Sequence, residues 1–201
     1  MEELKVPYNI YAEITPNPNT IKFVSNKLLV EDGKTYEFTD PDATEGFPLI
    51  EKVFNFPFVD KILLSGNYLA VTKNNLIEDW QDVVIELREF VQNYLRNGGE
   101  VMISGTNKET LQNGTSENEV IIVEPKTEVE KRIVQALEDY VLPAVERDGG
   151  MIYFKKFEDG VLTLSMRGAC QGCPSSMITL KNGIETLMKQ MIPEVKEVIA
   201  D

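Results

Sequence analysis

Two cysteines, Cys170 and Cys173, are the residues of this chain whose type and spacing are best suited to chemistry. The chain holds no other cysteine and no histidine. Thiolates at Cys-x-x-Cys spacing exchange disulfides, bind zinc or hold an iron–sulfur cluster. The absence of histidine removes the Ser-His-Asp and Cys-His nucleophiles and every imidazole metal site. We therefore expect no catalytic residue and do not expect an enzyme, unless the cysteine pair itself is redox-active.

The residues around the pair favour a bound anionic sulfur. Gly168 and Gly172 lack a Cβ, so the backbone can approach a bulky ligand closely. Pro174 suits the first turn of a helix, where its missing N–H costs nothing. The N–H groups and the dipole of such a helix start stabilise thiolates.

The number of ligands limits what the pair can hold. Zinc sites and cubane clusters take four protein ligands, and this chain supplies two. Either species would have to be shared between two chains, with Cys170 and Cys173 contributed by each. A thioredoxin-like dithiol oxidoreductase needs no sharing, but it is disfavoured by the Gln-Gly centre of the loop and by an element order without a β-α-β start. Disulfide exchange, a shared cluster and a zinc-bridged interaction module all stay open on these residues.

The elements that must position the loop follow from hydrophobic spacing. We expect a helix over 128–147, kinked or ended early by Pro143, then strands over 151–157 and 161–166. A helix over 174–191 and a strand over 195–199 complete an α-β-β-α-β unit. Met177, Met188 and Met191 are assigned to the core of that last helix. Asp148-Gly149-Gly150 is interpreted as a turn that shapes the fold, with a role beside a bound cluster as the alternative.

The first half of the chain predicts a second unit. Strands are expected over 6–14, 20–24, 28–30, 61–64 and 68–72, and helices over 46–56 and 77–95. Residues 104–119 are polar and nearly free of large apolar side chains, which is typical of a flexible linker. We therefore predict an α+β protein of two small mixed domains: 1–103, a linker over 104–125, and 126–201.

Composition narrows the partners and the location. A formal net charge of −13 disfavours binding to nucleic acid, because phosphate backbones would be repelled. No apolar run approaches the length of about 20 residues that spans a bilayer, so no membrane is expected. The acidic first residues do not resemble a signal or transit peptide, and we expect a cytoplasmic protein.

Residues 128–200 closely resemble the C-terminal domain of NifU, the Nfu-type domain. The resemblance rests on three runs: Pro143-Ala144-Val145-Glu146-Arg147-Asp148-Gly149-Gly150, Gly168-Ala169-Cys170-Gln171-Gly172-Cys173-Pro174-Ser175-Ser176, and Thr179-Leu180-Lys181-Asn182-Gly183-Ile184-Glu185. Residues 9–102 look like the N-terminal domain of two-domain Nfu proteins, on the runs 15–23 and 47–73. The resemblance covers nearly the whole chain except the linker.

This resemblance implies a scaffold or carrier for a [4Fe–4S] cluster that bridges two subunits and is delivered to apo-proteins. It makes Cys170 and Cys173 the cofactor and metal ligands, and a homodimer the cluster-loaded form. Apo iron–sulfur proteins would be the acceptors, and an upstream assembly scaffold would be the donor. The separate scaffold and ferredoxin-type domains of long NifU proteins have no counterpart here, so carrying a finished cluster fits better than building one.

Overall fold

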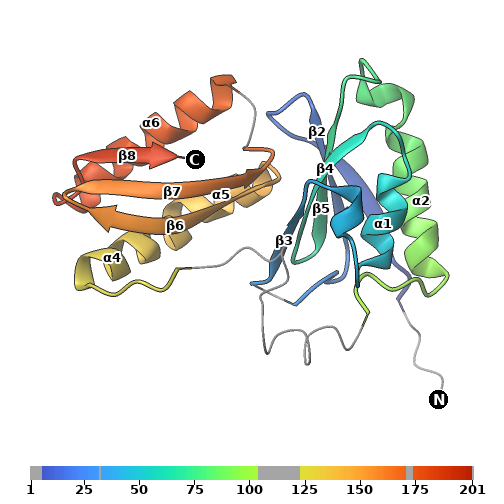
Figure 1. Cartoon of the computed structure of the whole chain (residues 1–201), viewed down its shortest axis with the longest axis horizontal. Coiled ribbons are helices and arrows are strands. Elements are labelled where there is room, and N and C mark those ends of the chain that lie inside the picture. The colour runs from blue at the N-terminus through green and yellow to red at the C-terminus, as the bar shows by residue number, and fades with distance from the viewer. Residues whose placement is uncertain (1–5, 32, 104–122, 171–173, 201) are drawn as a thin grey trace. The chain divides into compact units, whose positions relative to one another are not determined.

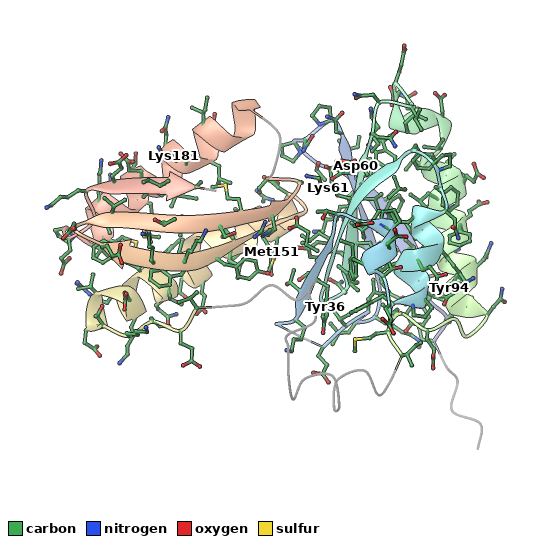
Figure 2. All side chains as sticks on the ribbon, in the orientation of Figure 1. Tyr36, Asp60, Lys61, Tyr94, Met151 and Lys181 are labelled. Atoms are coloured by element: carbon green, nitrogen blue, oxygen red, sulfur yellow. The ribbon has the colours of Figure 1, made fainter. Side chains whose placement is uncertain are left out.

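The computed structural model describes residues 6–31, 33–103, 123–170 and 174–200, with side chains throughout these ranges except at 174–177. The chain forms two compact units, one carrying β1 to α2 and the other α4 to β8 (Figure 1). Each unit has a core of its own (Figure 2). The α+β prediction is therefore confirmed. The domain limits stay predictions, and most of the expected linker, 104–125, lies outside the described residues.

The first unit is built on a five-stranded antiparallel sheet in the order β1-β2-β5-β4-β3. Its strands are β1 (Ile10–Ile14), β2 (Thr20–Ser25), β3 (Thr35–Phe38), β4 (Val59–Ser65) and β5 (Tyr68–Lys73). Helices α1 (Pro48–Phe54) and α2 (Val84–Arg96) cover one face of this sheet (Figure 1). Two 3₁₀ turns, η1 (Pro41–Ala43) and η2 (Trp80–Asp82), precede these helices.

The strand predicted over 28–30 is wrong. The backbone N–H groups of Leu29 and Val30 both donate to the carbonyl of Gly66, at 2.8 and 3.1 Å, so they make a turn contact and no strand ladder. The edge of the sheet beside β4 is instead formed by β3, which pairs antiparallel with it.

The second unit follows the predicted α-β-β-α-β order. Its helical part runs through α4 (Glu128–Ala136), a π-helical turn η4 (Leu137–Val141) and α5 (Leu142–Arg147). Strands β6 (Gly150–Glu158) and β7 (Val161–Gly168) pair antiparallel. Helix α6 (Pro174–Met191) then leads to β8 (Glu197–Ala200), which runs parallel to β7 and gives the sheet order β6-β7-β8.

Pro143 bends the helical part as expected, and the bend has a specific form. Proline has no backbone N–H, and its ring clashes with the carbonyl four residues earlier. The chain responds just before Pro143 with the π-helical turn, in which the N–H of Leu142 donates to the carbonyl of Leu137. At the start of α4, Thr127 and Glu130 form a reciprocal capping box that satisfies the first N–H groups.

Met188 is fully buried, which confirms its predicted place in the core of the second unit. Met191 is 41% exposed, so its assignment to that core is wrong. Met191 is the last residue of α6, and the side chain of Met177 lies outside those that the structure describes. Among the described helices, none combines the length and apolar character needed to cross a bilayer.

Candidate functional site

Cys170 lies in a tight turn that leaves the sheet directly after β7. The strand ends at Gly168, and Ala169 and Cys170 form the turn. The Cys170 side chain is 7% exposed and belongs to the apolar core of its unit. Cys173 lies outside the described residues. Pro174 begins α6, as the sequence predicts, so the helix starts one residue after Cys173.

Backbone geometry at the end of β7 sets the direction of this turn. Gly168 has a φ of +64°, in the left-handed region that L-residues rarely adopt. It stands opposite Gly150 in the β6–β7 register. The next N–H, that of Ala169, donates to the carbonyl of Gly149 at 3.1 Å. The chain is thereby folded back across the start of β6, which brings Cys170 over that strand.

The Asp148-Gly149-Gly150 segment forms the other side of the site. It is a turn, as predicted, because the Gly149 N–H donates to Glu146 O at 3.0 Å and Gly149 has a φ of +78°. The same segment also contacts the turn that carries Cys170. The Ala169–Gly149 hydrogen bond joins the two turns, and a Cβ added at Gly150 would lie 2.3 Å from the Cys170 sulfur.

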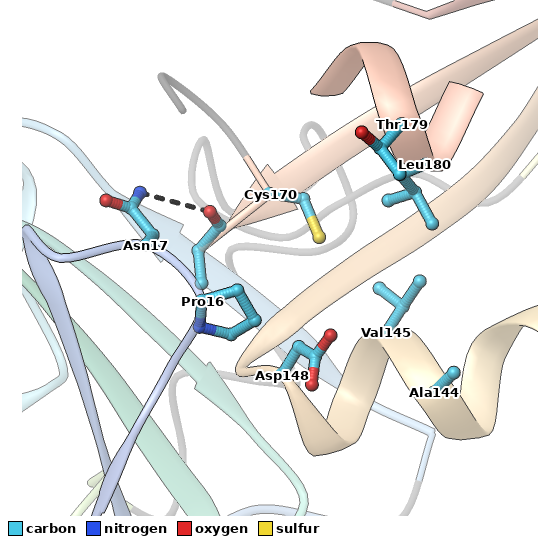
Figure 3. A pocket seen from close by; sticks show the side chains of 9 residues that line it. Pro16, Asn17, Ala144, Val145, Asp148, Cys170, Thr179 and Leu180 are labelled. Carbon is cyan, nitrogen blue, oxygen red and sulfur yellow. Dashed lines mark hydrogen bonds between the residues drawn. The ribbon is translucent and has the colours of Figure 1, made fainter. Parts of the chain in front are cut away.

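Side chains from three parts of this unit lie near the Cys170 side chain (Figure 3). They are Ala144 and Val145 of α5, Asp148 of the following turn, and Thr179 and Leu180 of α6. Most of them are apolar. A thiol in such a setting is a soft, weakly hydrated ligand, the kind that zinc and iron–sulfur species take from proteins.

No described part of the chain completes a metal site around this thiol. Within the described ranges, no group of three or more His, Cys, Asp or Glu side chains is placed to hold a metal ion. Asp148 is the carboxylate drawn beside Cys170 (Figure 3).

Arg167, near the end of β7, has a half-buried side chain. Its backbone carbonyl is the part that enters the site's geometry, since it lies 3.1 Å from a Cβ added at Gly150. The close approach of Gly150 to the sulfur is missing from the sequence interpretation. The sequence feature that could have indicated this close approach is Gly150 itself, because the turn needs glycine at Gly149 but not at the next position.

Two family models match this chain, one in each of its two units. Residues 133–199 match the model of the NifU-like domain, and residues 10–98 match that of the Nfu/NifU N-terminal scaffold domain. The chain is 32% identical over 189 residues to the human protein named NFU1 iron-sulfur cluster scaffold homolog, mitochondrial. That match covers 94% of this chain and 70% of the human one.

This chain belongs to the Nfu family of NifU-like proteins. A NifU-like protein of Schizosaccharomyces pombe is also 32% identical, over 193 residues that cover 94% of this chain and 71% of that one. The Nfu resemblance inferred from the residue runs is therefore confirmed. Both family domains are present in this Nfu chain, and the NifU-like match includes β6, β7, the cysteine turn and α6.

Proposed function

We propose that this Nfu protein is a non-enzymatic carrier that holds a [4Fe–4S] cluster between two copies of the chain and passes it to apo-proteins. Cys170 and Cys173 of each copy are the four ligands. The observation that carries this proposal is the ligand count. The chain has two cysteines and no histidine, and Cys170 lies at a strand end directly before a helix.

Because each copy supplies only two of the four ligands, such a protein can release its cluster when the two copies separate. A cluster enclosed by four cysteines of one chain is lost only when that chain opens. A cluster shared by two chains is exposed when the two copies separate, and an acceptor's thiolates can then replace them one at a time. A symmetric pair of identical half-sites also matches the commonest arrangement of protein dimers.

The family of this chain supports a role in iron–sulfur cluster metabolism, because the human relative carries the name of an iron–sulfur cluster scaffold. We propose apo iron–sulfur proteins as the acceptors and an upstream assembly scaffold as the donor. A cytoplasmic location stays a prediction from the sequence. The name of the human relative places that protein in mitochondria.

Anaerobic reconstitution of the full chain with iron and sulfide tests the proposal. We expect about two irons and two sulfides per chain, the absorption of a cubane cluster, and a doubling of the mass in solution. Adding an iron chelator should return the mass to that of one chain. Cys170→Ser and Cys173→Ser should each abolish retained iron. Gly183→Ala, at an exposed position of α6 with open space around it, is the matched control and should retain it.

Three results would contradict the proposal. A chain that stays monomeric and retains no iron is not a cluster carrier. Tightly bound zinc with no cluster under any reconstitution would favour the zinc-bridged module. Reduction of a disulfide substrate that depends on both cysteines would favour the dithiol oxidoreductase.

A further inference from the structure

Gly150 lies closer to the Cys170 sulfur than any other amino acid would allow. A Cβ built on Gly150 would be 2.3 Å from Sγ, 3.2 Å from Cys170 Cβ and 3.1 Å from the carbonyl of Arg167. Carbon and sulfur do not approach to 2.3 Å without a bond, so the volume of that missing Cβ is occupied by the thiol. The sulfur therefore sits in a niche that exists because residue 150 has no side chain.

Backbone conformation does not explain this glycine. Gly149 and Gly168 both have positive φ angles, of +78° and +64°, and each needs glycine for that reason. Gly150 is not among the residues with positive φ, and it is the first residue of β6, paired with Gly168. An alanine could adopt its backbone angles without strain. What an alanine could not do is leave room for the sulfur.

We propose that Gly150 is a positioning residue for the Cys170 thiol, which rests on the proposed function of this thiol as a cluster ligand. The niche keeps the sulfur in one side-chain rotamer against β6. A ligand confined in this way needs no further ordering when the cluster binds, and it is slow to swing away afterwards. Filling the niche leaves the backbone of the turn in place and releases the thiol into other rotamers.

Gly150→Ala is expected to preserve the fold, because the closest clashing atom is the rotatable end of a side chain. The remaining contacts, at 3.1 and 3.2 Å, are tight but open to small adjustments. The effect should therefore appear at the thiol rather than in the unfolding midpoint of the unit. Gly183→Ala is again the matched control, since a Cβ there meets no atom within 4 Å.

The first measurement needs no cluster. In the full chain carrying Cys173→Ser, Cys170 is the sole thiol, and its alkylation by iodoacetamide under native conditions reports how well the sulfur is held. Adding Gly150→Ala should speed alkylation by about threefold or more, because a displaced thiol is more accessible. Adding Gly183→Ala should leave the rate unchanged. An unchanged or slower alkylation rate with Gly150→Ala would contradict the proposal that the niche at Gly150 holds the thiol.

The second measurement links the niche to the cluster. The chain with both cysteines is reconstituted, and iron loss to a chelator is followed with and without Gly150→Ala. Loss should be faster with alanine, again by about threefold or more. Faster alkylation with unchanged iron loss would overturn the positioning role. If the unmodified chain takes up no iron, the proposed function fails, and the alkylation comparison still decides whether the niche exists.

Discussion

Gly168→Ala tests whether the turn after β7 is set by backbone conformation. Gly168 has a φ of +64°, and an L-residue in the left-handed region costs about 1–2 kcal/mol. A domain of about 60–100 residues loses about 4–8 °C of melting temperature per kcal/mol. We therefore expect Gly168→Ala to lower the melting temperature of the second unit by about 5–15 °C. Thermal unfolding of the metal-free full chain, followed by circular dichroism, measures this shift.

Gly160→Ala provides a matched control at the opposite end of the same strand. Gly160 has a φ of +88° in the β6–β7 turn, and its added Cβ would meet the flexible side chain of Lys196 and, at 3.1 Å, the carbonyl of Glu194. The backbone cost should therefore be similar at both positions. Only Gly168 borders the turn that carries Cys170, so only Gly168→Ala should also weaken iron retention at temperatures where both variants are folded.

A rescue variant makes this reasoning refutable. Asparagine tolerates the left-handed region better than alanine, so Gly168→Asn should recover part of the lost melting temperature. A melting temperature of Gly168→Ala within about 1 °C of the unmodified chain would refute the conformational argument. Equal iron loss in Gly160→Ala and Gly168→Ala would show that general destabilisation, rather than the cysteine turn, controls retention.

Two further predictions concern α6. Met188→Ala removes a fully buried side chain and should lower the free energy of unfolding, measured in urea, by about 2–5 kcal/mol. Gln190→Ala, at an exposed position of the same helix, is the control and should have little effect. A loss below about 1 kcal/mol for Met188→Ala would contradict the packing. Hydrogen bonds from the side chain of Lys189 and from the backbone N–H of Val198 lower the pKa of Glu185 below its ordinary 4.5. The ionised carboxylate therefore stabilises the unit above pH 4.5, and this contribution is lost as the pH falls through the lowered pKa. The unfolding midpoint should fall less steeply below pH 4.5 in Glu185→Gln, and an unchanged slope would contradict this assignment.

Much of the fold could be predicted because local patterns agree with the tertiary structure. The alternating residues of β6 and β7, the turn between them and the apolar spacing of α6 each specify their element without help from distant residues. The strand predictions fail where contacts with a segment distant in the sequence determine the local structure. Residues 28–30 have strand composition, yet Gly66 captures two of their N–H groups. β3 is a strand because β4 offers an edge to pair with.

Some features of the candidate site could likewise be predicted from adjacent residues, whereas others depend on segments distant in the sequence. Cys170, the strand end before it and the helix start at Pro174 were all predicted from adjacent residues. The surroundings of the sulfur were not, because Val145, Asp148 and Leu180 come from segments separated along the chain. Asp148-Gly149-Gly150 shows both cases together. Its turn is a local property, and its contact with the cysteine turn depends on the register of the sheet.

The sequence by itself determined the order of the elements in the second unit, the family and the number of cysteines, because each depends on residue type and spacing alone. Only the tertiary structure decided that Gly150 holds the thiol of Cys170. The reason is physical: the antiparallel register of β6 and β7 sets Gly150 opposite Gly168, and the positive φ of Gly168 then turns the sulfur into the space that a Cβ would fill. That space is formed by β6 together with the turn after β7, so no single stretch of sequence could have predicted it.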